Sequence, residues 1–295
     1  MRADIMKKLA KPMLFAAAII WGTSFFIMKN TLDVMPVFSL LSVRFTAGAA
    51  LLGLVCWNKW KHMTADYLWR GAIIGAFLFL AYTIQTFGLE RTTPSKNAFL
   101  TAVYCVMVPF FYWAVMSRRP DRWNILAALL CVTGVGLVSL NGDLTVNLGD
   151  VLTLIAAGFY AAHIVAVEKT SQGKDIYLLT VFQFAFAALY AWVGTALWEQ
   201  FPVQAIQDPA VFLPLGYLCV MATTVALLFQ NVGQIWSDPA SASIILSLES
   251  VFGVFFSVLC YGDRVTLPMG LGFVFIFVAV VCSETKFAFL RTKTK

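Results

Sequence analysis

The chain has 295 residues, of which 60% are hydrophobic and only 12% are charged, and its mean hydropathy is +0.81. A water-soluble domain usually carries about 25% charged residues, so this composition excludes a soluble globular protein and predicts a surface solvated by lipid. The net charge of +6 comes from short basic clusters between apolar segments, which argues against nucleic acid as a partner.

Ten apolar segments are long enough to cross a bilayer, whose hydrocarbon core of ~30 Å needs roughly 20 helical residues. In chain order they are residues 12–29, 36–57, 69–89, 95–117, 123–140, 149–168, 176–198, 211–235, 239–261 and 266–284. The connections between them are too short for a soluble domain. The sequence therefore predicts an all-α membrane protein with ten transmembrane helices.

The distribution of basic residues predicts the orientation of these helices. If the N-terminus is cytoplasmic, sixteen of the 21 Lys and Arg residues fall in cytoplasmic segments, four fall in outer segments, and Arg44 lies within a span. Lys and Arg accumulate on the cytoplasmic side of membrane proteins. We therefore expect both termini in the cytoplasm and a multi-pass location in the inner (cytoplasmic) cell membrane.

An internal repeat becomes visible when the chain is aligned with itself at an offset of 145 residues. The matched pairs include Gly71 with Gly216, Gln85 with Gln230, Gly88 with Gly233, Pro94 with Pro239, and Phe110–Phe111 with Phe255–Phe256. We expect two five-helix repeats, at residues 12–140 and 149–284. Because five is odd, the repeats enter the membrane from opposite sides, an arrangement that suits alternating access in transporters of small solutes.

Four stretches of sequence resemble a known family. The first span contains IIWGTSFFIMKN, the second contains Arg44, the second half opens with GDVLTLIAAGFYAAHIVAVEK, and the ninth and tenth spans contain DPASASIILSLESVFGVFFSVLCYGDRVTLPMGLGFVF. These stretches resemble the two EamA-type domains of the ten-helix drug/metabolite transporter superfamily. Glu249–Ser250 stands where that family tends to carry Glu-Pro. The resemblance covers residues 12–284 and implies transport of amino acids, nucleobase-like compounds, amines or drugs, often outward.

Two ionisable side chains, Arg44 and Glu249, lie deep in the predicted spans. Charge within a bilayer is costly, so such residues usually mark a functional site. The functional interpretation is a charge pair or solute clamp, in which Arg44 binds a carboxylate and Glu249 binds an ammonium group or a coupling proton. The alternative is a permanent ion pair that locks two helices together.

Uncharged polar and aromatic residues extend this candidate site. Gln230 and Gln234 share a helix face, Gln85 is the repeat partner of Gln230, and Tyr104 aligns with Glu249. Further substrate-binding candidates are Asn97, on the same face as Tyr104, and Trp21 of the first span. The alternative roles are interhelical hydrogen bonds, worth ~0.6–2 kcal/mol each, and, for Trp21, an anchor at the membrane interface.

The sequence contains no motif for enzymatic or ATP-driven chemistry. It has no P-loop, no H-E-x-x-H and no nucleophile elbow, and it contains six scattered cysteines and two histidines. We expect no catalytic residue, no metal site and no cofactor. The predicted function is a secondary transporter that exports amino acids or related small metabolites, with a proton as a candidate coupling ion. The alternative is a flippase for a lipid or a lipid-linked small molecule.

Overall fold

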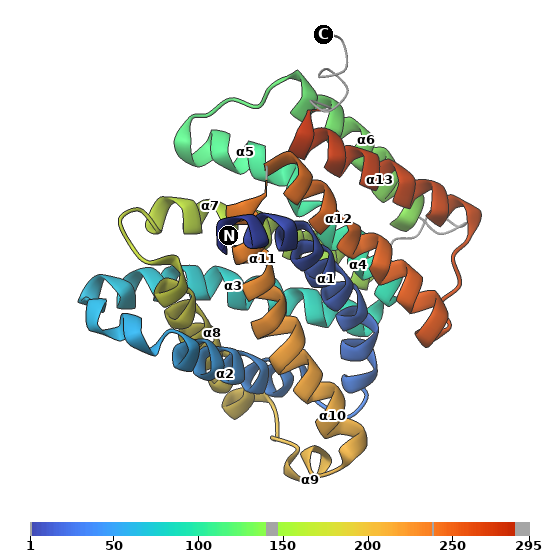
Figure 1. Cartoon of the computed structure of the whole chain (residues 1–295). Helices are drawn as coiled ribbons and strands as arrows, with labels where there is room; N and C mark the ends of the chain where they lie inside the picture. The colour runs from blue at the N-terminus through green and yellow to red at the C-terminus, as the bar shows by residue number, and fades with distance from the viewer. Residues whose placement is uncertain (1, 140–146, 238, 287–295) are drawn as a thin grey trace.

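The computed structural model describes residues 2–139, 147–237 and 239–286, and within them all the regular secondary structure is helical (Figure 1). Ten helical segments of the described chain are long and apolar enough to cross a membrane, which confirms the predicted fold class. The helices are α1 (Arg2–Thr31), α2 (Val37–Val55), α3 (Ala65–Arg91), α4 (Pro94–Ala102), α5 (Tyr104–Met116), α6 (Arg122–Ser139), α7 (Leu148–Thr170), α8 (Ile176–Trp198), α9 (Val203–Ile206), α10 (Pro209–Tyr217), α11 (Ala226–Trp236), α12 (Pro239–Phe256) and α13 (Leu267–Thr285).

Three shorter helical segments complete the chain order. They are a 3₁₀ turn, η1 (Trp57–His62), and two π-helical segments, η2 (Leu218–Val225) and η3 (Ser257–Tyr261). Span 4 consists of α4 and α5, span 8 of α10, η2 and α11, and span 9 of α12 and η3. We call the end of the bundle where α1 begins and α13 ends the terminal end, and the opposite end the distal end.

Span 4 is broken at Val103, whereas the sequence predicted one continuous helix. Pro109 within α5 has no N–H, so the carbonyl of Cys105 loses its donor four residues later. The hydroxyl of Ser283, on α13, donates to this carbonyl at 3.2 Å. A backbone group freed inside the membrane is thus satisfied by a neighbouring helix, as lipid surroundings require.

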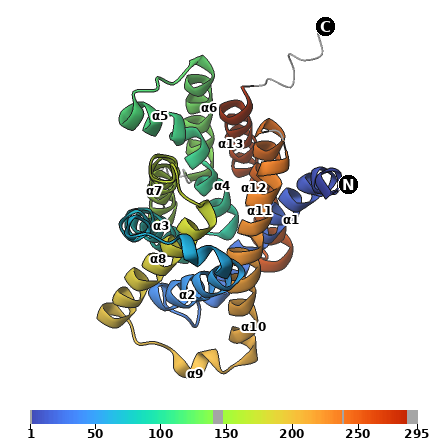
Figure 2. The same cartoon turned by 60° about the vertical axis from the view of Figure 1, so that its left-hand side comes forward.

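The contacts between helices repeat from one half of the chain to the other. α1 packs on α11 and α12 of the second half, and α7 packs on α3, α4 and α5 of the first (Figure 2). At the 145-residue offset these are equivalent pairs, since α7 is the counterpart of α1. α2 packs on α8, and α6 packs on α13, so each of these pairs joins two equivalent helices. The first helix of each half therefore completes the other half.

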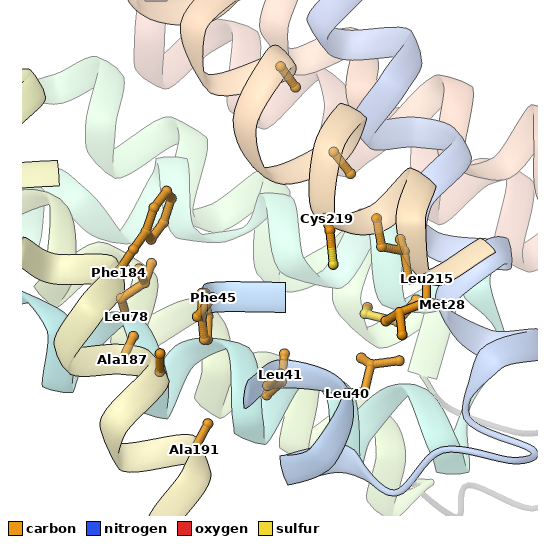
Figure 3. Packing of buried hydrophobic residues seen from close by; sticks show 14 of the residues in the cluster. Met28, Leu40, Leu41, Phe45, Leu78, Phe184, Ala187, Ala191, Leu215 and Cys219 are labelled. Carbon is orange, nitrogen blue, oxygen red and sulfur yellow. The ribbon is translucent and has the colours of Figure 1, made fainter. Parts of the chain in front are cut away.

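A hydrophobic cluster fixes α2 against α8 and span 8 (Figure 3). Phe45 is 1% exposed and lies beside Leu78 and Phe184, with 6.0 Å between the ring centroids of Phe45 and Phe184. Phe45 directly follows Arg44, so its packing limits how far the neighbouring guanidinium can move.

At the distal end, a buried ion pair joins α4 to α7. Lys96 Nζ lies 3.1 Å from Asp150 Oδ2, and the Asp150 side chain is fully buried. The Thr92 hydroxyl donates to the other oxygen of the same carboxylate. The sequence did not identify this pair, because both residues lie near predicted span ends, where charged residues are common.

Replacing Lys96 with Met should lower the free energy of unfolding by about 3–5 kcal/mol, because it leaves the buried Asp150 carboxylate without its cation. The measurement is a denaturant titration in mixed detergent micelles. Adding Asp150→Leu to Lys96→Met should recover part of the lost free energy of unfolding, because the double variant no longer buries an unpaired carboxylate.

The matched control is Glu90→Gln, which removes the partly exposed pair between Arg91 and Glu90. It should cost less than about 1 kcal/mol. Equal losses for Lys96→Met and Glu90→Gln would contradict the assigned importance of the buried pair.

Candidate functional site

Two adjoining cavities lie among the spans. The larger, about 460 Å³, is lined by α4, α5, α7, α11, α12 and α13. The smaller, about 240 Å³, is lined by α1, α2, α3, α4, α5, α7, α11 and α12. Both cavities are lined by Thr101, Tyr104, Ile164, Gln230 and Glu249. These shared side chains form the wall between them, so the cavities are two compartments of one site.

Arg44 projects from α2 into the smaller cavity and is only 2% exposed. Its Nε donates to Thr223 Oγ1 at 2.7 Å, and one terminal nitrogen lies 3.6 Å from Met28 Sδ. The guanidinium carbon lies 5.0 Å from the ring centroid of Tyr82. Within the described residues, Arg44 forms no ion pair with a carboxylate, so its buried positive charge is held only by uncharged groups.

The hydrogen bond to Arg44 depends on the π segment η2. Thr223 donates its own hydroxyl hydrogen to the Leu218 carbonyl, five residues earlier, at 2.8 Å. This leaves the oxygen lone pairs to accept from Arg44. The indole of Trp21 donates to the Ala222 carbonyl in the same segment at 2.8 Å. π segments are rare and often occur at functional sites.

Glu249 projects from α12 and lines both cavities. Its carboxylate forms no hydrogen bond or ion pair with another residue in the described part of the chain. The structure thus brings Arg44 and Glu249 to the same cavity, as the sequence suggested, but does not join them in the permanent ion pair that was the alternative interpretation. Two opposite charges that face one cavity without meeting each other can each bind part of a solute.

The two repeat-matched glutamines have different surroundings. Gln85 Nε2 donates to Thr101 Oγ1 at 2.8 Å, and its Oε1 accepts from the Tyr160 hydroxyl at 2.8 Å. Gln85 therefore ties α3 to α4 and α7 while it lines the smaller cavity. Gln230 lines both cavities and forms no side-chain hydrogen bond with a described residue, so its amide is available to a solute.

The remaining sequence candidates divide between cavity and helix packing. Tyr104 lines both cavities, and Trp21 lines the smaller one. Asn97 lines neither, because its Nδ2 donates to Thr153 Oγ1 at 2.8 Å and to the Gln85 carbonyl at 3.3 Å. Asn97 therefore forms interhelical hydrogen bonds, which was the alternative role for the polar candidates. The side chain of Gln234 lies outside the described residues.

Several residues of the site, Thr223 beside Arg44 and two residues that line the larger cavity, were not among the sequence candidates. Thr223 has no signal in the sequence, because nothing there predicts the π segment that aims its hydroxyl at Arg44. Tyr112 and Glu284 line the larger cavity near the terminal ends of α5 and α13. Polar residues near span ends usually face water or headgroups, so only the tertiary structure identifies these two as cavity residues.

Comparisons with known proteins agree with this architecture. The EamA-like transporter family matches residues 9–140 and again residues 147–285. An uncharacterized transporter of Archaeoglobus fulgidus is 33% identical over 265 residues, which cover 90% of this chain and 82% of the relative. The uncharacterized transporter YoaV of Bacillus subtilis is 21% identical over 95% of this chain and 97% of the relative.

A solved crystal structure supports the fold alone. It superposes with a TM-score of 0.66 over 95% of this chain and 98% of the other chain, at 16% sequence identity. The resemblance noted in the sequence is confirmed by the two family matches and by the Archaeoglobus relative. The chain belongs to the EamA-like transporter family.

Proposed function

We propose that this transporter is a secondary exporter of a small zwitterion, an amino acid or a related metabolite. The observation that supports this proposal is the placement of Arg44 and Glu249, which face the same cavity without pairing with each other. The two cavity volumes together fall within the ~300–1,000 Å³ typical of ligand sites. A metabolite with one carboxylate and one ammonium group matches this charge arrangement.

In this proposal the solute supplies the counter-ions that the protein lacks. Its carboxylate binds the guanidinium of Arg44, and its ammonium group binds the carboxylate of Glu249. Hydrogen bonds between charged partners are worth ~1.5–3 kcal/mol each when they replace water. Gln230, whose amide is not used by a described residue, adds a neutral donor and acceptor between the two charges.

Glu249 also offers a route for coupling to a proton gradient. Its carboxylate binds either a proton or the ammonium group of the solute. Protonation removes the negative charge, so the two ligands compete for the carboxylate. A proton that enters from outside therefore displaces the solute, and a solute that enters from the cytoplasm displaces the proton. Because a proton or an ammonium group neutralises the buried carboxylate of Glu249, the transporter changes conformation more readily with this carboxylate occupied than with it empty.

The proposed orientation supports export. The larger cavity extends toward the terminal end as far as Tyr112 and Glu284. The bias of Lys and Arg favours a cytoplasmic terminal end, in an inner cell membrane. A site that reaches toward the cytoplasm is poised to load a cytoplasmic metabolite.

Glu249→Gln and Arg44→Gln should each reduce uptake of radiolabelled amino acids into proteoliposomes by about 10-fold to 100-fold, because each removes one charge-assisted contact. Arg44→Gln should also reduce the preference for an amino acid over its carboxamide derivative, in which a neutral amide replaces the carboxylate and the ammonium group remains, whereas Glu249→Gln should keep that preference.

Arg91→Gln, which changes a partly exposed arginine outside both cavities, is the control and should transport normally. The proposal fails if the wild type moves no amino acid or related zwitterion, or if both site variants keep full flux.

Thr223→Val should weaken solute binding by about 5-fold to 100-fold, since the buried Nε of Arg44 then lacks its acceptor, at a cost of about 1–3 kcal/mol. Solute-dependent thermal stabilisation of the purified protein measures the change in Kd. The matched control is Thr224→Val, because the neighbouring Thr224 donates to Cys219 in the same π segment and does not contact Arg44. Equal effects at the two positions would show that the segment acts only structurally.

The proposed orientation predicts which loops are accessible from outside the cell. In a cysteine-free background, a membrane-impermeant maleimide added to intact cells should label Gln204→Cys in α9 and should not label Lys61→Cys in η1. Both positions are exposed, so the reagent can reach either residue from its own side. The reverse pattern would contradict the proposed orientation, in which both termini lie in the cytoplasm.

A further inference from the structure

Spans 4 and 9, which are equivalent in the two halves, touch at the distal end and separate toward the terminal end. α4 packs directly on α12. By contrast, Val108 and Tyr112 of α5 lie across the larger cavity from Leu246 and Ser247 of α12. The divergence starts at the break at Val103, and both views show α5 directed away from α12 (Figures 1 and 2).

The contact at the distal end is a close seam without room for a larger side chain. A Cβ placed on Gly253 would lie 2.6 Å from the Cβ of Ala98, well inside van der Waals contact. Beside this contact, Asp263 Oδ2 accepts from the backbone N–H of Ser95 at 3.3 Å and from the Ser257 hydroxyl at 3.0 Å. Asp263 thus latches the start of α4 to the end of span 9.

The seam and the cavity wall are made of equivalent residues. At the 145-residue offset, Val108 is the counterpart of Gly253, and Tyr112 is the counterpart of Ser257. The half-spans that meet in the seam are therefore equivalent to the half-spans that the cavity separates. If the two halves exchanged conformations, the seam would become a gap and the gap would become a seam.

One polar atom beside the seam favours such an exchange. Ser95 Oγ is buried and has no hydrogen-bond partner in the described part of the chain. Buried groups without partners destabilise the state in which they occur. Water could reach this hydroxyl if the distal end opened, so opening would remove an unfavourable feature of the closed seam.

We propose that the seam between Ala98 and Gly253, latched by Asp263, is the gate that closes the solute site at the distal end. It opens when α5 closes onto the first half of α12. The gate controls access to the site of Arg44 and Glu249, and so its role in transport rests on the proposed function. Its movement can nevertheless be measured without any solute.

The test uses two cysteine reporters in detergent solution, each as the single cysteine of the chain. Cys105 lines the larger cavity and reports the terminal side. Ser95→Cys, at a fully buried position in α4 whose hydroxyl has no described partner, reports the seam. The rate of modification by a small maleimide is compared before and after Gly253→Ala.

Gly253→Ala should raise the rate at Ser95→Cys by about tenfold and lower the rate at Cys105, because the added methyl group cannot fit against Ala98 in the closed seam. The control is Gly158→Ala in α7, where an added Cβ meets no atom within 4 Å. It should leave both rates unchanged. If Gly253→Ala does not yield a monodisperse protein, Asp263→Asn replaces it, because this substitution weakens the latch. Asp263→Asn should raise the rate at Ser95→Cys and lower the rate at Cys105, both by less than Gly253→Ala.

A parallel rise at both reporters would indicate general loosening and would overturn the gate, as would unchanged rates in a folded Gly253→Ala protein. A reciprocal change without solute flux in proteoliposomes would support the gate and refute the transport proposal. Solute flux in the wild type, with no reciprocal change of the two rates in the variants, would support the transport proposal and refute the gate.

Discussion

The buried charge of Arg44 is the constraint on which the rest of the site depends. A guanidinium is always ionised, and moving it from water into a protein surrounded by lipid is costly unless other groups compensate. Here the compensation comes from a threonine hydroxyl, a methionine sulfur and the face of a tyrosine ring. None of these carries a negative charge. The site therefore keeps an unmet preference for an anion, and this preference is the basis of the proposal that Arg44 binds a solute.

The irregular helices follow from that constraint and from the surroundings of the chain. Non-helical or widened backbone is tolerated at membrane depth only where protein groups satisfy it. The π segment η2 meets this condition, because Thr223 and Trp21 both bond to its carbonyls. The break in span 4 meets it through Ser283, which caps the carbonyl that Pro109 leaves without a donor. The break in span 4 lies at the larger cavity, which Ala102 and Tyr104 line, and η2 reaches the smaller cavity through the contact of Thr223 with Arg44.

The repeated helix contacts hold the two halves together, while the different courses of spans 4 and 9 close one end of the bundle and leave the other open. α1 and α7 each complete the opposite half, so the two halves cannot separate without breaking equivalent sets of contacts. What distinguishes the halves is the course of spans 4 and 9. Span 4 bends at Val103, whereas α12 continues through Ser250, whose backbone N–H allows an unbroken helix at that point. This single asymmetry places the seam at the distal end and the larger cavity toward the terminal end.

Hydropathy by itself determined the fold class, because the length and composition of a lipid-solvated helix are set by the bilayer and not by its neighbours. The same reasoning marked Arg44 and Glu249, since charge is conspicuous in apolar segments, and both residues do face the same cavity. The 145-residue offset likewise paired helices whose contacts turned out to be equivalent. These features depend on local sequence or on its repetition.

The tertiary structure decided what local sequence could not express. Asn97 and Gln85 have similar amides in similar surroundings, yet Asn97 packs between helices and Gln85 reaches the cavity. Thr223 and Thr224 are adjacent and identical, yet only Thr223 meets Arg44. In each case the difference is set by a contact with a segment far away in the chain, with Thr153 of α7 for Asn97 and with Arg44 of α2 for Thr223. The sequence therefore determined which polar and charged groups lie within the spans, and the packing decided which of them line the cavities.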